Sequence, residues 1–134
     1  MESTSKKTII VGIVALVAVI GLLLYASRSS NGPGKLDGFA MCLKDKGALF
    51  YGAFWCSHCQ NQKALFGSSK KYLPYIECST PDAKSQLPVC VANKIASFPT
   101  WVFPDMSTTT GEISLAVLSE KTGCALPTEE ESIK

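Results

Sequence analysis

The main feature of the hydropathy pattern is an uninterrupted apolar segment near the start of the chain. Residues 9–26 form a stretch of eighteen residues without a charge. As a helix, this stretch would span about 27 Å, close to the hydrocarbon core of a bilayer at about 30 Å. A core helix of a soluble domain shows a polar face, which this segment lacks. We therefore expect a transmembrane anchor at residues 9–26.

The charges that flank this segment predict its orientation. Lys6 and Lys7 precede it and only Arg28 follows closely. The positive-inside rule then places residues 1–8 in the cytoplasm and makes this a single-pass protein of the cell membrane. A cleaved signal peptide is the alternative, although its apolar region would be long and it lacks a small residue at the −3 position. Both interpretations place the remainder of the chain on the extracytoplasmic side.

Beyond residue 26 the pattern alternates between helical and extended spacing. Residues 27–34 are rich in Ser, Gly and Pro and predict a flexible tether. Helices are predicted at residues 36–46, 57–66, 87–95 and 114–122, with Ser114 as N-cap and Gly123 as the stop. Strands are predicted at residues 48–54, 72–78, 100–103 and near 111–113, with a polar loop at 79–85, a turn at 104–110 and an acidic tail at 127–134. This order predicts an α/β domain over residues 35–126, with strands parallel where a helix joins them.

Composition narrows the possible functions. The chain has 134 residues, 46% of them hydrophobic, a net charge of +2 and six cysteines. This length allows one ordinary domain and excludes a multidomain enzyme. The apolar content excludes a disordered chain, and the small net charge argues against nucleic acid as a partner. All six cysteines follow the apolar segment, and an even number in an exported domain permits full pairing.

Two of these cysteines form the pattern Cys56-Ser-His-Cys59 at the predicted junction of a strand and a helix. On the first turn of a helix, the two sulfurs lie close enough to bond. Cys56 would lie at the helix N-terminus, where free N–H groups and the macrodipole favour a thiolate. Cys59 would lie one turn further in. We therefore expect Cys56 to exchange with substrates through a mixed disulfide and Cys59 to resolve it.

A structural zinc site and a merely structural disulfide are the two other interpretations of this pair. A structural zinc site needs a second close pair, but Cys78 and Cys90 have eleven residues between them. We therefore expect no metal. A merely structural disulfide is the other alternative, and the strand-to-helix position with its flanking aromatic residues argues against it.

The motif at residues 54–59, FWCSHC, resembles the active site of the thioredoxin superfamily. The motif SFPTW at residues 97–101 is similar to the cis-proline loop of that superfamily. Together with residues 51–56 and 75–79, these motifs most closely resemble the thioredoxin-like domain fused to, or partnering, the vitamin K epoxide reductase homologues of bacteria and plants. The resemblance covers residues 36–124. It implies a thioredoxin-like fold, in which a central mixed sheet is flanked by helices.

The resemblance also implies how a substrate is docked. A cis peptide bond before Pro99 would turn the backbone of Phe98 toward the two cysteines, where it could hold a substrate segment as a short added strand. Trp55, Phe98, Pro99 and Thr100 are the docking residues expected on this basis. Taken alone, Pro99 is better explained as an ordinary proline at the start of a strand, and only together with the Cys56–Cys59 motif does the cis-proline interpretation become the favoured one.

Two positions favour a disulfide donor over a reductase. His58, the only histidine, would stabilise a Cys56 thiolate as imidazolium, which makes the disulfide more oxidising. A histidine at this position resembles the DsbA family of bacterial oxidants. Phe50 stands six positions before Cys56, where the thioredoxin family carries a buried acidic residue. The proton acceptor used by reductases is thus missing.

The resemblance implies a disulfide between Cys78 and Cys90, since relatives carry a second pair at matching positions. A relay pair that exchanges with Cys56 is the alternative role for these two. Cys42 lies on the apolar face of the first predicted helix and Cys124 follows the last one. The sequence leaves open whether they pair.

These observations lead to one main functional hypothesis and two alternatives. The chain is expected to be a membrane-anchored thiol–disulfide oxidoreductase that oxidises thiols of exported proteins. It would need no cofactor beyond the Cys56–Cys59 disulfide. A quinone-linked membrane partner, resembling the vitamin K epoxide reductase family, would re-oxidise it. The alternatives are a thioredoxin-like reductase or isomerase, and a non-catalytic anchored binding module with structural disulfides.

Overall fold

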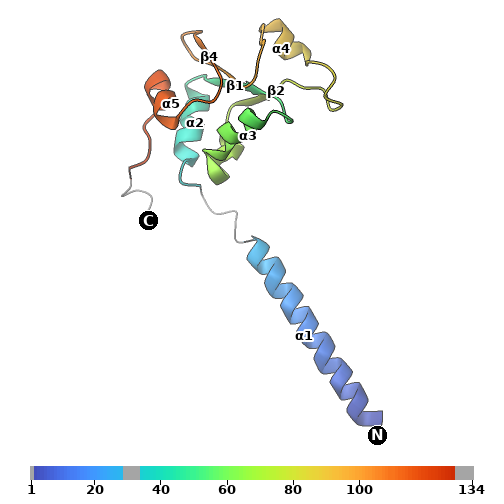
Figure 1. Ribbon diagram of the computed structural model, residues 1–134. Helices are drawn as coiled ribbons and strands as arrows, with labels where there is room; N and C mark the ends of the chain where they lie inside the picture. The colour runs from blue at the N-terminus through green and yellow to red at the C-terminus, as the bar shows by residue number, and fades with distance from the viewer. Residues whose placement is uncertain (1, 29–33, 129–134) are drawn as a thin grey trace. The chain divides into compact units, whose positions relative to one another are not determined.

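The computed structural model describes residues 2–28 and 34–128 of the chain (Figure 1). Contacts divide the chain into two compact units, Met1–Gly32 and Pro33–Lys134. The first unit contains one helix, α1 (Glu2–Arg28). Within the described ranges, no helix combines the length and the apolar character needed to cross a membrane. The transmembrane anchor expected at residues 9–26 is therefore not supported. The predicted tether and acidic tail lie partly outside the described residues.

The second unit is built on a four-stranded mixed sheet with the order β2-β1-β3-β4. The strands are β1 (Leu49–Gly52), β2 (Tyr75–Glu77), β3 (Thr100–Val102) and β4 (Thr108–Thr110). Strand β1 pairs with β2 in parallel and with β3 in antiparallel orientation, and β4 pairs antiparallel with β3. A mixed sheet with flanking helices was predicted, and this arrangement fits a thioredoxin-like fold.

The predicted helices form in the expected order with shifted bounds, and a 3-10 helix that was not predicted lies between the second and the third of them. The helices are α2 (Asp37–Asp45), α3 (Ser57–Ala64), the 3-10 helix η2 (Gly67–Tyr72), α4 (Pro88–Ala92) and α5 (Leu115–Thr122). The predicted caps of α5 are confirmed. The Ser114 side chain accepts a hydrogen bond from the Val117 N–H, and Gly123 ends the helix with φ of 71°. Helices α4 and α5 lie on opposite sides of the domain (Figure 1).

Strand β3 corrects the expectation that helix-connected strands run parallel. Thr100, the first residue of β3, pairs with Tyr51 near the end of β1, and β2 also ends at this edge, where Glu77 pairs with Gly52. Helix α4 between β2 and β3 has five residues. It spans about 7.5 Å, so the chain stays at this edge of the sheet instead of crossing back to the other.

The last strand was predicted at the wrong residues. Residues 104–110 were expected to form a turn and 111–113 a strand, but β4 occupies Thr108–Thr110. The turn is shorter, because the Phe103 N–H donates to the Ser107 carbonyl and closes it. Three consecutive β-branched threonines then suit an extended strand. Gly111, with φ of 95°, ends the strand.

The core of the domain is aromatic and centres on Phe50 in β1. The Phe50 ring stacks on Trp101 at a centroid distance of 4.8 Å and meets the edge of Tyr75 at 5.2 Å. Phe50 and Trp101 are both fully buried. The position at which the thioredoxin family buries an acid is thus part of an apolar stack.

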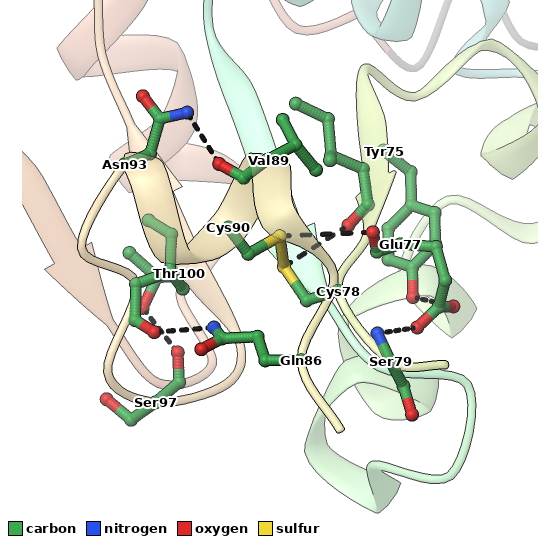
Figure 2. The surroundings of a disulfide bond; sticks show 12 residues. Tyr75, Glu77, Cys78, Ser79, Gln86, Val89, Cys90, Asn93, Ser97 and Thr100 are labelled. Atoms are coloured by element: carbon green, nitrogen blue, oxygen red, sulfur yellow. Dashed lines mark hydrogen bonds between the residues drawn. A yellow bond between two sulfur atoms is a disulfide. The ribbon is translucent and has the colours of Figure 1, made fainter. Parts of the chain in front are cut away.

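Two disulfides connect parts of the domain that are distant in sequence. Cys42 in α2 bonds to Cys124 after α5, across 82 residues, which answers the question that the sequence left open. Cys78 bonds to Cys90 in α4, across 12 residues. Figure 2 shows this second bond between the end of β2 and α4. Because Cys78 and Cys90 are both fully buried, their position favours a structural role over a relay.

Removing each disulfide tests how much it stabilises the fold. In the chain-entropy view, a cross-link stabilises by about 3 kcal/mol for a loop near 15 residues and by about 4.7 kcal/mol near 100 residues. We expect the double variant Cys42→Ala/Cys124→Ala to lower the free energy of unfolding by more than Cys78→Ala/Cys90→Ala does. Urea denaturation of the non-reduced proteins measures both. An equal or smaller loss of stability in Cys42→Ala/Cys124→Ala would contradict the expectation that the disulfide closing the longer loop contributes more.

Candidate functional site

The end of β1 and the start of α3 place the two remaining cysteines. After Gly52 the chain turns, and the Cys56 N–H donates to the Ala53 carbonyl at 3.0 Å. Cys56 is the N-cap of α3, with extended backbone, and its sulfur accepts a hydrogen bond from the Cys59 N–H at 3.2 Å. The expected position of Cys56 at a helix N-terminus is thus found in the structure.

The two sulfurs are close together but differ in exposure. Sγ of Cys59 lies 2.6 Å from Sγ of Cys56, and both cysteines are free. Cys56 keeps 7% of its surface accessible, whereas Cys59 is fully buried. Cys56 also lines an open groove and Cys59 does not, so a reactant in that groove can approach the first cysteine and not the second. This asymmetry is what dithiol exchange through one attacking and one resolving cysteine needs.

Burial determines the protonation of Cys59. Loss of hydration is the largest cause and the hydrogen bond with Cys56 is the second. Together they raise the pKa of Cys59 to about 12. Cys59 is therefore a neutral thiol at physiological pH. The nearby ammonium group of Lys63 acts in the opposite direction and favours the Cys59 thiolate. Cys59 can leave as a thiolate during exchange, but it regains a proton afterwards.

Lys63, Tyr75 and Glu77 form a charged cluster near Cys59. Nζ of Lys63 lies 3.3 Å from the centroid of the Tyr75 ring, and the Tyr75 hydroxyl donates to Oε2 of Glu77 at 2.8 Å. Burial lowers the pKa of Lys63. The sequence analysis did not identify this cluster. The spacing of four residues between Cys59 and Lys63 on one helix could have indicated that Lys63 lies near the buried sulfur.

Gly52 leaves the space that Cys59 occupies. A β-carbon on Gly52 would lie 2.8 Å from Cε2 of Tyr75 and 3.0 Å from Sγ of Cys59. Both distances are shorter than carbon–carbon or carbon–sulfur contacts allow. The absence of a side chain at the end of β1 thus permits the buried sulfur to pack against the strand.

Trp55 is joined to the segment that carries the buried disulfide. Its indole N–H donates to Oγ of Ser79 at 2.8 Å, and the neighbouring Phe54 N–H donates to Oε1 of Glu77 at 3.2 Å. The Ser79 N–H donates to the same oxygen of Glu77 at 2.9 Å (Figure 2). The turn before Cys56 is therefore held by the residues on either side of Cys78.

An open groove lies next to Cys56 and contains two of the four expected docking residues, Trp55 and Phe98. The peptide bond between Phe98 and Pro99 is cis, as the resemblance implied. The Phe98 ring meets Trp55 edge-on at a centroid distance of 6.1 Å. The residues that line the groove are Trp55, Cys56, Ser57, His58, Ala96, Ser97 and Phe98.

Two predicted docking residues lie outside this groove. The Pro99 ring is fully buried, and Thr100 keeps only 5% of its surface exposed. The Thr100 hydroxyl donates to the Ser97 carbonyl at 2.8 Å. The Pro99 and Thr100 side chains therefore support the loop from the protein interior. Trp55 and Phe98 form the accessible surface.

His58 is paired with a residue that the sequence analysis did not identify. Nδ1 of His58 lies 2.6 Å from Oε1 of Glu112, and the Asn61 side chain donates to the same oxygen at 3.1 Å. Both contacts lower the pKa of Glu112, and the hydrogen bond with His58 has the larger effect. Because His58 and Glu112 are 54 residues apart, no local motif joins them. Within the described ranges, no three His, Cys, Asp or Glu residues are grouped to hold a metal ion.

Comparison with known proteins identifies a relative to set beside this geometry. No family model matches the chain. The thiol-disulfide oxidoreductase LTO1 of Arabidopsis thaliana is 42% identical over 109 residues, which cover 78% of this chain. The chain spans 28% of the length of that relative.

Differential alkylation tests the asymmetry of the two cysteines. We expect iodoacetamide to modify Cys56 in the reduced, folded protein at pH 8 and to leave Cys59 unmodified, because Cys59 is buried and neutral. An ordinary thiol becomes reactive as the pH passes about 8.5. Cys59 should become reactive only as the pH approaches its pKa of about 12. Peptide mass mapping reads the result. Equal modification of both at pH 8 would contradict the arrangement.

The close approach at Gly52 gives a second test. Gly52→Ala should destabilise the reduced protein by about 1–3 kcal/mol, because its β-carbon meets Tyr75 and Cys59. Gly38→Ala in α2 is the matched control, since a β-carbon there meets nothing within 4 Å. That change should stabilise the protein by up to about 1 kcal/mol. Thermal unfolding measures both, and a neutral Gly52→Ala variant would show that the strand and sulfur are not in tight contact.

Proposed function

We propose that the chain is a thioredoxin-like thiol–disulfide oxidoreductase. The observation that carries this proposal is the pair of free cysteines at the start of α3, with sulfurs 2.6 Å apart, one accessible and one buried. The mixed sheet fits the fold expected for such an enzyme. The similarity to a relative named thiol-disulfide oxidoreductase supports the same activity.

The proposed reaction transfers a disulfide from the protein to its substrate. A substrate thiolate attacks Sγ of Cys56, a bond forms between those two sulfurs, and the electron pair of the Cys56–Cys59 bond goes to Cys59. A second substrate thiolate then attacks the substrate sulfur and releases Cys56. Two substrate thiols become one disulfide, and the protein disulfide becomes two thiols. Because the pKa of Cys59 is raised, this sulfur takes up a proton after it leaves, and the resulting neutral thiol is a poor nucleophile for the reverse attack.

Two neighbours of Cys56 further support the role of disulfide donor. Phe50 lies in an apolar stack, so no carboxylate is available there to accept a proton from Cys59. His58 lines the same groove as Cys56, and its imidazolium would stabilise the Cys56 thiolate, as in DsbA-like enzymes. Both features favour the reduced form of the site and hence a more oxidising disulfide.

We propose that substrates bind in the groove beside Cys56. Trp55 and Phe98, whose rings meet edge-on, offer apolar contact surface in its lining, and the Phe98 backbone precedes a cis peptide bond. An extended segment that contains the reacting cysteine could add there as a short strand. Backbone pairing of this kind reads little of the substrate sequence and suits an enzyme for many exported proteins.

The proposed setting is an oxidising compartment outside the cytoplasm. The disulfides Cys42–Cys124 and Cys78–Cys90 support it, because such bonds persist where thiols are not kept reduced. Each round of the reaction leaves Cys56 and Cys59 reduced, so an electron acceptor must restore them. We propose a quinone-linked membrane protein, resembling the vitamin K epoxide reductase family, as that partner. Membrane attachment through residues 9–26 stays a prediction from the sequence.

Single-cysteine variants test the activity. Cys56→Ser should abolish oxidation of a reduced peptide, and Cys59→Ser should accumulate a mixed disulfide on Cys56, because the resolving thiol is gone. Cys78→Ala/Cys90→Ala is the control and should retain activity while it stays folded. Peptide oxidation that survives Cys56→Ser would contradict the assignment of Cys56 as the reacting cysteine, and an unmodified chain that binds the peptide without oxidising it would be a binding module.

The reduction potential of the Cys56–Cys59 pair tests the direction. We expect a value nearer to about −120 mV, as for DsbA, than to about −270 mV, as for thioredoxin. Equilibration with glutathione buffers, followed by mass spectrometry, measures it. A potential at the thioredoxin end would assign the chain to reductases.

A further inference from the structure

The loop between β4 and α5 is fixed to α3 by a buried glutamine. The Gln62 side chain is fully buried, and its amide donates to the Ile113 carbonyl at 3.0 Å. The Ile113 N–H donates back to Oε1 of Gln62 at 2.8 Å. Since both hydrogen bonds are buried or part-buried, they hold the backbone beside Glu112 in one position relative to the helix.

From this fixed position Glu112 reaches the exposed face of α3. Its Oε1 lies 2.6 Å from Nδ1 of His58 and accepts a second hydrogen bond from Asn61 at 3.1 Å. An ionised carboxylate only accepts hydrogen bonds, so Nδ1 of His58 carries a hydrogen. In the neutral ring the other nitrogen, Nε2, is then an acceptor. Within the described part of the chain, nothing hydrogen bonds to Nε2, and the His58 side chain is 69% exposed.

The surroundings of His58 define what this nitrogen can contact. His58 lines the groove next to Cys56, where a substrate thiol must arrive to attack. The titratable groups around it are Cys56 and Cys59 on its own helix segment and Glu112 opposite. The other side of the groove, formed by Ala96, Ser97 and Phe98, carries no titratable group. An incoming thiol therefore meets one free base in this groove, Nε2 of His58.

We propose that His58 and Glu112 form a catalytic pair that deprotonates the substrate thiol. This inference rests on the proposed function and adds a role for two residues. Nε2 of His58 takes the proton of the thiol while the sulfur forms its bond to Sγ of Cys56, and the electron pair of the Cys56–Cys59 bond moves to Cys59. Glu112 is the positioning residue: it keeps the hydrogen on Nδ1 and stabilises the imidazolium that forms. The proton returns to solvent, and Cys59 regains one.

The chemistry of thiols limits the size of the effect. A thiol with a pKa of about 8.5 is about 3% ionised at pH 7, so a general base can accelerate its attack by at most about 30-fold. The gain must disappear when the thiol is already ionised, either above pH 9 or because its pKa is low. If Glu112 had a purely electrostatic or structural role, its effect on the reaction rate would not depend on the ionisation of the substrate thiol in this way.

The test compares Glu112→Gln with Glu120→Gln, an exposed glutamate on α5 that lies outside the site. The measurement is the single-turnover rate at which the oxidised full chain reacts with an alkyl thiol peptide and with an aromatic thiol that is ionised at pH 7. With the alkyl thiol at pH 7, Glu112→Gln should slow the reaction by about 3- to 30-fold. With the aromatic thiol, or with either thiol at pH 9.5, its rate should stay within about twofold of the unmodified chain. Glu120→Gln should match the unmodified chain throughout.

Further variants separate the possible failures. Glu112→Asp should recover part of the lost rate, and His58→Asn should reproduce the dependence of Glu112→Gln on thiol pKa. Equal slowing with both thiols, or none with either, would overturn the proposed pair. If the unmodified chain reacts and Cys56→Ser does not, such a result rejects the pair alone. An unmodified chain that does not react with any thiol rejects the proposed function itself.

Discussion

Burial of the Cys59 sulfur against the end of β1 is the constraint on which the site depends. The sulfur fits there because Gly52 has no side chain, and the N-cap geometry of Cys56 brings the second sulfur to 2.6 Å. Burial raises the pKa of Cys59 to about 12 and leaves Cys56 as the accessible partner. One packing contact therefore separates two chemically identical residues into an outer and an inner thiol.

Different parts of the domain surround the two sulfurs. Near Cys59, Lys63 lies over the Tyr75 ring, and its charge favours a thiolate that burial disfavours. Beside Cys56, His58 is held by Glu112 from the other end of the chain. A basic side chain thus lies near each sulfur, the half-buried Lys63 near Cys59 and the exposed His58 beside Cys56. Exchange needs both sulfurs to leave as thiolates in turn, and this arrangement supports each departure separately.

The docking surface is supported by the second disulfide. Trp55 donates to Ser79, the residue after Cys78, and Cys78 is bonded to Cys90 in α4. The loop between Ser79 and Gln86 is therefore closed at its base (Figure 2). A fixed Trp55 keeps the groove beside Cys56 in place while the loop itself stays polar and exposed. The disulfide thus lies one residue from the hydrogen-bond partner of Trp55, and its burial favours a structural role.

The sequence alone determined the features that depend on neighbouring residues. The α/β order, the Ser114 cap and the position of Cys56 at a helix start follow from local spacing and backbone preference. Tertiary structure decided the antiparallel direction of β3, the pairing of Cys42 with its distant partner, and the contact of Glu112 with His58. Each of these joins residues that are far apart in the chain. Their proximity depends on how the elements pack, because no local pattern encodes which distant side chains meet.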